Sequence, residues 1–300
     1  MEQENLFYDL LQQLEKELII FPDKKEENAN NTLRSLWHLA YGIHISPILA
    51  EKQEISLLSS VQIEILKEFI KKRLSGVPLA HITERQHFMG LDFFLNNGLY
   101  IPRKETELLA KTVINTIHNE FATEKEIKVI DLCTGIGTIA LAIAQYCKNT
   151  HVFGSDIFGP AIKAAKINAR QFGIEDRTEF FHANLFEPFE PMELKDKISV
   201  IACNPPYISS AKVKEMRTEI SDHENQEAFD AGPMGFSVFN QLIAVAPEYI
   251  IDNGYLIFEC GLGQGDFLLN RLSKNTRYTE ITLVQDENGN GRVIKAKKIS

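Results

Sequence analysis

The stretch IKVIDLCTGIG at residues 127–137, followed by an apolar helical pattern over residues 138–147, decides the fold. Its β-branched beginning predicts a buried strand, and the glycine-bearing turn after it predicts direct entry into a helix. From here the strand and helix patterns alternate, as in a parallel sheet with crossover helices. Further strands are predicted at 151–155, 178–182, 198–203, 254–260, 278–284 and 292–298. We therefore expect an α/β fold whose last two strands form an antiparallel hairpin.

The first turn of this pattern has the features of a nucleotide site. Gly135 and Gly137 allow a ligand to approach the backbone closely, and a Gly-x-Gly between a strand and a helix is more specific than one found alone. Asp156, at the tip of the next strand, is placed to accept both hydroxyls of a ribose. It is also a favoured cap for the helix starting near Pro160, so both interpretations stay open. After strand 178–182, Asn184 and Leu185 can hold an adenine by its edge and face.

A second loop carries the chemistry. Strand 198–203 ends in Asn204-Pro205-Pro206-Tyr207, where neither proline can extend a sheet ladder. The Asn204 side-chain carbonyl and the Pro205 backbone carbonyl can converge on a planar NH2 group, and Tyr207 offers an aromatic face for stacking. The alternative is an ordinary proline-rich turn. The histidines are scattered without metal-ligand spacing, so no metal site is predicted.

The composition limits where and on what the protein acts. The chain has 300 residues with 44% apolar content, and its formal charge is −9, from 41 acidic and 32 basic residues. This balance weighs against direct binding of nucleic acid through phosphates. We see no secretory signal and no apolar run near the roughly 20 residues that span a bilayer. The four cysteines are not closely paired in sequence, which favours free thiols in a reducing cytoplasm.

The chain before residue 108 is expected to form separate parts. Residues 1–75 predict a small helical bundle with one apolar stripe around Trp37 and another around Leu66, while residues 23–31 predict an exposed loop. Ser59 and Gln62 have capping-box spacing. Residues 76–107 predict two strands around a turn and a joint to the domain at 108–300. We also expect a helix at 105–118, a loop over the substrate at Ser209–Phe229 and a helix at 235–251.

Together these residues resemble one family, the HemK/PrmC-type protein-(glutamine-N5) methyltransferases, which methylate the Gly-Gly-Gln glutamine of peptide chain release factors. The resemblance covers most of the chain and rests on a combination of motifs. These are Gly76-x-Pro78-Leu79, Phe88-x-Gly90-Leu91, Ile101-Pro102-Arg103-x-Glu105-Thr106-Glu107, Asp131-x-x-Thr134-Gly135-x-Gly137, Asp156, Asn204-Pro205-Pro206-Tyr207, Glu259-x-Gly261-x-Gly263-Gln264-Gly265 and Asp286-x-x-Gly289.

The resemblance implies a Rossmann-like class I methyltransferase domain of seven strands after an N-terminal helical domain. Because the helical domain at 1–75 and the loop Ser209–Phe229 carry no donor chemistry, we expect them to dock the acceptor. S-adenosyl-L-methionine would lie across Cys133, Thr134, Gly135, Ile136 and Gly137, with Asp156 on its ribose, Asn184 and Leu185 near its adenine, and Asn204 near the transferred methyl. Asn204, Pro205, Pro206 and Tyr207 would bind the substrate glutamine of a release factor. Asn204, Pro205 and Tyr207 would be catalytic through positioning and electrostatics, without a general base.

Some positions depart from the family pattern. Cys133 and Ile136 stand where Gly and Ser are usual, Glu84 replaces a usual Gly, and Ala231–Gly235 differs from the typical helix entry. These changes favour a relative that methylates another small-molecule or peptide acceptor. A nucleic-acid adenine N6-methyltransferase shares the Asn-Pro-Pro-Tyr motif, but the acidic balance counts against it. A binding module without turnover is a further alternative, which the intact motif opposes.

Overall fold

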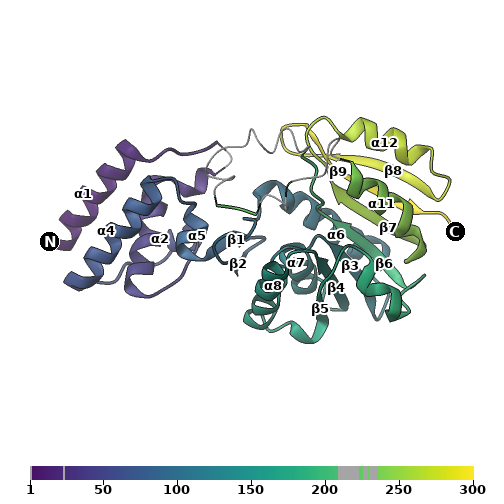
Figure 1. Ribbon diagram of the computed structural model, residues 1–300, viewed down its shortest axis with the longest axis horizontal. Helices are drawn as coiled ribbons and strands as arrows, with labels where there is room; N and C mark the ends of the chain where they lie inside the picture. Colours follow the sequence, from purple (N-terminus) through teal and green to yellow (C-terminus); the bar gives the residue numbers. More distant parts are fainter. Residues whose placement is uncertain (1, 23, 209–222, 226–228, 230–235) are drawn as a thin grey trace. The chain divides into compact units, whose positions relative to one another are not determined.

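The computed structural model describes residues 2–22, 24–208, 223–225, 229 and 236–300, and the chain divides into two compact units (Figure 1). The first comprises residues 1–101 with 217–224, and the second comprises residues 102–216 with 225–300. The division at Ile101 and Pro102 falls inside the predicted joint at 76–107. Most of the predicted loop Ser209–Phe229, and the helix entry Ala231–Gly235, lie outside the described residues.

The first unit contains a helical bundle whose core is the predicted apolar stripe. Leu33, Leu36 and Trp37 on one helix and Leu66 on another are almost completely buried in a single cluster. Ser59 and Gln62 form the predicted capping box. The helices are α1 (Glu2–Glu17), η1 (Lys25–Glu27), α2 (Ala29–Tyr41), α3 (Pro47–Ala50), α4 (Ser60–Leu74) and α5 (Leu79–Thr83).

The prediction of an exposed loop at residues 23–31 is wrong for most of that range. The segment contains η1 and the beginning of α2, and Glu27 is only 5% exposed. Arg73, on α4, donates from Nη2 to Glu27 Oε2 at 2.9 Å. A local pattern of charged residues predicts exposure to solvent, but an ion-pair partner 46 residues away allows this carboxylate to be buried.

The predicted pair of strands is a short hairpin in the same unit. Strands β1 (Arg85–Phe88) and β2 (Leu91–Phe94) pair in antiparallel fashion, with Phe88 opposite Leu91. Met89 and Gly90 form the two-residue turn, and both have positive φ, +51° and +78°. Positive φ at both positions matches the twist of the flanking strands, so this sequence closes directly without a longer loop.

The second unit is built on one seven-stranded sheet, as predicted. Its order is β5-β4-β3-β6-β7-β9-β8, and every pair up to β7 is parallel while β9 is antiparallel to both neighbours (Figure 1). The chain therefore winds outward from β3 in both directions. The strands are β3 (Ile127–Leu132), β4 (Thr150–Asp156), β5 (Thr178–His182), β6 (Ile198–Cys203), β7 (Ile250–Glu259), β8 (Tyr278–Gln285) and β9 (Gly291–Lys298).

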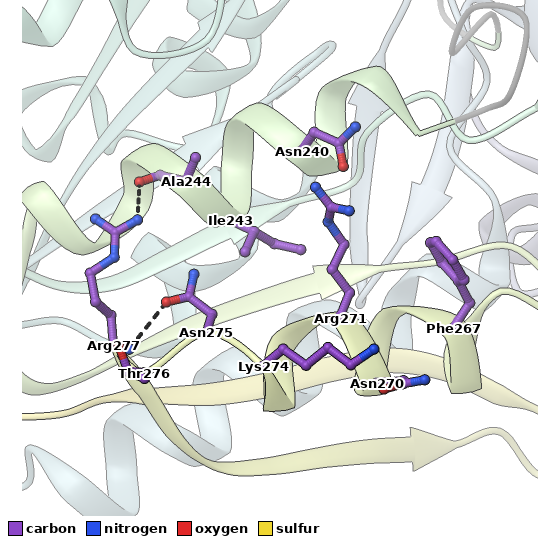
Figure 2. A pocket seen from close by; sticks show the side chains of 10 residues that line it. All are labelled: Asn240, Ile243, Ala244, Phe267, Asn270, Arg271, Lys274, Asn275, Thr276 and Arg277. Carbon is purple, nitrogen blue, oxygen red and sulfur yellow. Dashed lines mark hydrogen bonds between the residues drawn. The ribbon is translucent and has the colours of Figure 1, made fainter.

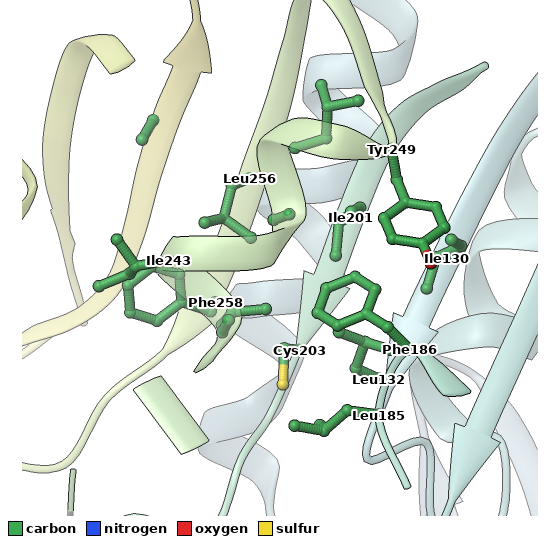
Figure 3. Close-up of a cluster of buried hydrophobic side chains, with 14 of the residues drawn as sticks. Ile130, Leu132, Leu185, Phe186, Ile201, Cys203, Ile243, Tyr249, Leu256 and Phe258 are labelled. Carbon is green, nitrogen blue, oxygen red and sulfur yellow. The ribbon is translucent and has the colours of Figure 1, made fainter. Parts of the chain in front are cut away.

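Helices α11 and α12 help to bury the main apolar core of this sheet. Alternate residues of the central strands, among them Ile130, Ile201 and Leu256, pack with Ile243 of α11 in one buried cluster (Figure 3). The helical elements of this unit are η2 (Lys104–Thr106), α6 (Glu107–Glu120), α7 (Thr138–Tyr146), α8 (Gly159–Gln171), η3 (Glu175–Arg177), η4 (Glu187–Met192), α11 (Ser237–Val245), η6 (Ala246–Glu248) and α12 (Gly265–Ser273).

Two predicted helices have different bounds in the structure. The helix expected at 235–251 ends at Val245, and β7 begins at Ile250, where Ile250 pairs with Ile198. Pro247 in the short η6 turn cannot donate to a continuing helix. The helix expected from residue 105 begins as a 3-10 turn and becomes α-helical at Glu107. Among the described residues, no helix is both long and apolar enough to cross a bilayer.

Candidate active site

The predicted site residues of the second unit gather because the parallel strands end at the same edge of the sheet. Leu132 of β3 pairs with Ser155 of β4 and with Cys203 of β6, and Cys203 pairs with Phe258 of β7. The residues that follow these strand ends are therefore neighbours across the sheet. In an open α/β sheet, ligands bind beyond the carboxyl ends of the strands.

The glycine loop after β3 has the backbone conformation that its sequence requires. Gly135 and Gly137 have φ of +57° and +86°, and Cys133, where Gly is usual, adopts φ of +56°. A side chain at Gly137 would lie 3.0 Å from Leu141 and 3.2 Å from Phe180, whereas the same position at Gly135 meets open space. The loop thus packs tightly at Gly137 and leaves room for a ligand at Gly135.

Asp131, near the end of β3, fixes this loop through hydrogen bonds. Its Oδ2 accepts a hydrogen bond from the Thr134 hydroxyl at 2.6 Å and another from the Ala140 amide at 3.1 Å. The carboxyl is fully buried, and its Oδ1 has no hydrogen-bond partner among the described residues. Burial raises the pKa of Asp131 to about 7, although the two hydrogen bonds lower it. Thr134 therefore has a structural bond in addition to any contact with a ligand.

Asp156 lies at the end of β4, beside the glycine loop. Its Oδ2 accepts from the Gly135 amide and its Oδ1 from the Phe158 amide, both at 2.8 Å. Phe158, not Asp156, is the N-cap of α8, so the carboxylate binds the backbone ahead of the helix instead of capping it. Each carboxylate oxygen keeps a free lone pair for a hydroxyl. Burial raises the pKa of Asp156, against the effect of the two amides.

The predicted adenine contacts differ in their surroundings. Asn184 is exposed, and its backbone amide and side chain donate to the Glu187 carboxylate at 3.2 and 3.5 Å. Leu185 is 6% exposed, packs in the sheet core, and accepts from the Ser155 hydroxyl through its backbone oxygen at 2.7 Å. The Leu185 side chain thus packs in the core, and its backbone oxygen is already bonded to Ser155. Ile136 is also buried, at 3% exposure.

The Asn204 amide is held on one side only. Its Nδ2 donates to the Thr106 hydroxyl at 3.3 Å, and Thr106 is itself 3% exposed. Asn204 Oδ1 is buried and accepts no hydrogen bond from any residue that the structure describes. A buried amide oxygen without a donor carries a free-energy cost, so its retention next to a strand end indicates a ligand that donates.

Tyr207 is fixed through both its side chain and its backbone. Its hydroxyl donates to Glu259 Oε1 at 3.2 Å, and its backbone oxygen accepts from Gln264 Nε2 at 3.0 Å. Burial, reinforced by the Glu259 charge, raises the pKa of Tyr207 well above its usual value, so the ring is a neutral phenol. Pro205 is buried and Pro206 is half-buried between these two anchored residues.

These residues fit S-adenosyl-L-methionine. Open space at Gly135 admits a ligand to the backbone, the adjacent Asp156 carboxylate suits a ribose diol, and the orphaned Asn204 oxygen lies after the neighbouring strand. Within the described ranges, no three histidine, cysteine or carboxylate side chains are grouped to hold a metal ion.

A separate pocket of about 550 Å³ lies between α11, α12 and the loop that leads into β8 (Figure 2). Arg271, Lys274 and Arg277 line it, and Arg277 donates to the backbone oxygen of Ala244 at 2.6 Å. None of the predicted site residues lines this pocket, so it is distinct from the strand-end site.

The sheet order and the strand-end site define the class of the protein: it is a class I S-adenosylmethionine-dependent methyltransferase. Residues 104–229 match the model of the methyltransferase small domain. A release factor glutamine methyltransferase of Bacillus anthracis is 30% identical over 273 residues, which cover 91% of this chain and 93% of the relative. The enzyme of the same description from Clostridium acetobutylicum is 32% identical over 253 residues, covering 82% and 86%. The chain belongs to the release factor glutamine methyltransferase family, so the resemblance stated from its motifs is confirmed.

Several side chains of the site were not singled out from the sequence. Thr106, Glu259 and Gln264 all occur within the motifs of the family resemblance, but the sequence did not predict which residues they contact. Asp131 was quoted as the start of the glycine turn. Arg292 had no local signal, since only the pairing of β9 with β7 brings it to Glu259.

Proposed function

We propose that this protein transfers a methyl group from S-adenosyl-L-methionine to the side-chain amide nitrogen of a glutamine, in the Gly-Gly-Gln segment of a peptide chain release factor. The observation that carries the proposal is the Asn204 amide, whose Nδ2 is held by Thr106 while Oδ1 is buried without a donor. An incoming NH2 group supplies the missing donor. The names of the relatives agree with this choice of acceptor.

The donor supplies an electrophilic methyl group on a sulfonium. Asp156 would hold the ribose hydroxyls of the donor, and the backbone at Gly135 would lie against the donor. Asn184 and Leu185 would flank the adenine. The rest of the glycine loop is formed by Cys133, Thr134, Ile136 and Gly137. Asp156 is already oriented by two backbone amides at 2.8 Å, so little side-chain freedom is lost on binding.

Asn204 and Pro205 would position the acceptor nitrogen. An amide nitrogen is a weak nucleophile because its lone pair is delocalised into the carbonyl. Asn204 Oδ1 and the Pro205 carbonyl, each accepting one N–H, would hold the nitrogen in line with the methyl and stabilise positive charge that develops on it. Tyr207 would pack on the amide plane, with Pro206 completing the loop. The surplus proton is acidic after transfer and leaves to water, so no general base is assigned.

A cytoplasmic site of action belongs to the same proposal. All four cysteines are free in the structure, as is usual in a reducing compartment. A docking role for the N-terminal helical unit, in recognition of the acceptor protein, is also part of the proposal. Deleting residues 1–70 tests it, provided that the remainder folds: a higher KM for the release factor is expected, and an unchanged KM refutes the role.

The main test is a transfer assay with labelled donor and purified release factor, followed by mass spectrometry of the Gly-Gly-Gln peptide. We expect a gain of about 14 Da, one methyl replacing one hydrogen, on the glutamine. A release factor with alanine at this glutamine is the acceptor control. Asn204→Ala should lower kcat at least about a hundredfold while donor binding is largely kept. Donor binding without transfer to the glutamine refutes the proposed acceptor.

A further inference from the structure

The segment after β7 contacts Tyr207 at several points that the sequence assigns to no function. Glu259 ends the strand, and Gly261 and Gln264 follow in the turn before α12. A Cβ added to Gly261 would lie 3.0 Å from Tyr207 Cδ2, so the glycine backbone is close against the tyrosine ring. Only a residue without a side chain allows this approach.

Gln264 connects the two loops through both ends of its side-chain amide. Its Oε1 accepts from the Gly261 amide at 2.9 Å, and its Nε2 donates to the Tyr207 backbone oxygen at 3.0 Å. The first bond fixes which way the amide points, so the nitrogen faces Tyr207. The turn after β7 therefore holds the backbone of the loop after β6.

Glu259 and Arg292 hold the other end of the tyrosine. Glu259 Oε1 accepts from the Tyr207 hydroxyl at 3.2 Å and from Arg292 Nη2 at 3.3 Å. Glu259 is 1% exposed and Arg292 is 9% exposed. Burial raises the pKa of Glu259, whereas the charge of Arg292 lowers it. The arginine thus favours the ionised carboxylate that the phenol needs as an acceptor.

Resting on the proposed function, we infer that Glu259 and Arg292 are positioning residues that act through Tyr207, and that Gln264 fixes the same loop through its backbone. A buried ion pair contributes no more to the stability of a fold than apolar residues of similar volume, so stability alone does not explain this pair. Here the pair gives the phenol a defined acceptor and so fixes the ring plane. That plane is the surface against which the substrate amide would stack.

The test is a double-mutant cycle with Glu259→Gln and Tyr207→Phe, measuring kcat and the KM for the release factor. If Glu259 acts through the Tyr207 hydroxyl, Glu259→Gln should lower kcat about tenfold in the parent and less than about twofold in the Tyr207→Phe background. Donor affinity, measured by calorimetry, should stay within about twofold. Equal losses in both backgrounds would show an independent structural effect and overturn the inference.

Two further variants separate charge from packing. Arg292→Lys keeps the positive charge and should retain more of kcat than Arg292→Met, since only the latter leaves Glu259 buried and uncompensated. Glu280→Gln is the matched control, because Glu280 pairs with Lys297 at 3.2 Å between β8 and β9 but is largely exposed. This control should leave kcat unchanged. Equal rates in the two Arg292 variants would contradict a role for the charge.

A measurement without turnover keeps the inference testable even if the acceptor is misassigned. Protein labelled with ¹³Cζ-tyrosine should show one resonance that disappears in Tyr207→Phe and shifts in Glu259→Gln. An unshifted resonance would refute the contact. Failure of the parent protein to methylate a release factor, with the shift present, would count against the proposed acceptor and leave the positioning network intact.

Discussion

Replacing Asp131 with asparagine should remove a pH dependence from the stability of the second unit. The Asp131 carboxyl is fully buried, and its pKa is raised from 3.8 to about 7 in the folded protein. At 1.36 kcal/mol per unit, a difference of this size corresponds to about 4 kcal/mol. Between the two values the folded state binds a proton that the unfolded state has lost. The stabilising effect is therefore complete below pH 3.8 and is lost as the pH rises through about 7.

The measurable part of this effect lies between pH 5 and 8. As the pH rises over this range, the free energy of unfolding of the parent should fall by about 3 kcal/mol relative to that of Asp131→Asn, because asparagine does not titrate. Asparagine keeps an oxygen for the Thr134 and Ala140 bonds, so the loop geometry is retained. Titrating groups that do not interact with Asp131 are shared by both proteins and cancel in the difference between them.

The assay is urea unfolding followed by tyrosine near-ultraviolet circular dichroism at several pH values. Tyr249, Tyr255 and Tyr278 are buried in the second unit and report on it. We expect the free energy of unfolding of Asp131→Asn, minus that of the parent, to rise with pH between 5 and 8. A difference that stays constant across this range would refute the assignment of the raised pKa to Asp131.

Two further substitutions test contacts that span long stretches of sequence. Thr106→Val should lower kcat about tenfold without changing donor affinity, because Asn204 Nδ2 loses its partner and the amide can rotate; an unchanged kcat in steady-state assays would contradict this. Arg73→Met should reduce the stability of the first unit by up to about 3–5 kcal/mol, since the buried Glu27 carboxylate loses its partner at 2.9 Å, while Lys24 lies farther away at 3.9 Å. Fluorescence of the single tryptophan, Trp37, reports on the unfolding of that unit. Lys67→Met is the control: it breaks an exposed ion pair and should lower the free energy of unfolding by less than about 1 kcal/mol.

The strands of the second unit were predictable because their patterns are local. The runs at 127–132, 178–182 and 198–203 coincide with β3, β5 and β6. β-Branched residues bounded by glycine, asparagine or proline specify both the strand and its end. Since parallel strands end at one edge, the gathering of Asp156 and Asn204 near the glycine loop also follows from the pattern.

Contacts between distant residues were beyond the reach of such patterns. Glu27 was predicted to lie in an exposed loop and Arg292 was predicted only as the start of a strand, yet each lies in a buried ion pair. The partner determines burial, and nothing in the neighbouring sequence identifies it. The start of β7 at Ile250 was missed for the same reason, because the apolar pattern before Gly254 suits a helix as well as a strand.

The Asn204–Tyr207 loop is fixed largely by residues outside its own motif. Pro205 and Pro206 have no N–H to donate, so the loop has few backbone hydrogen bonds with which to hold its shape. Side chains take their place: Thr106 binds the Asn204 amide, while Glu259 and Gln264 bind the two ends of Tyr207. Positioning within a fraction of an ångström requires such supports. Under the proposed function, an Asn-Pro-Pro-Tyr sequence without these partners should therefore bind an amide loosely and transfer methyl slowly.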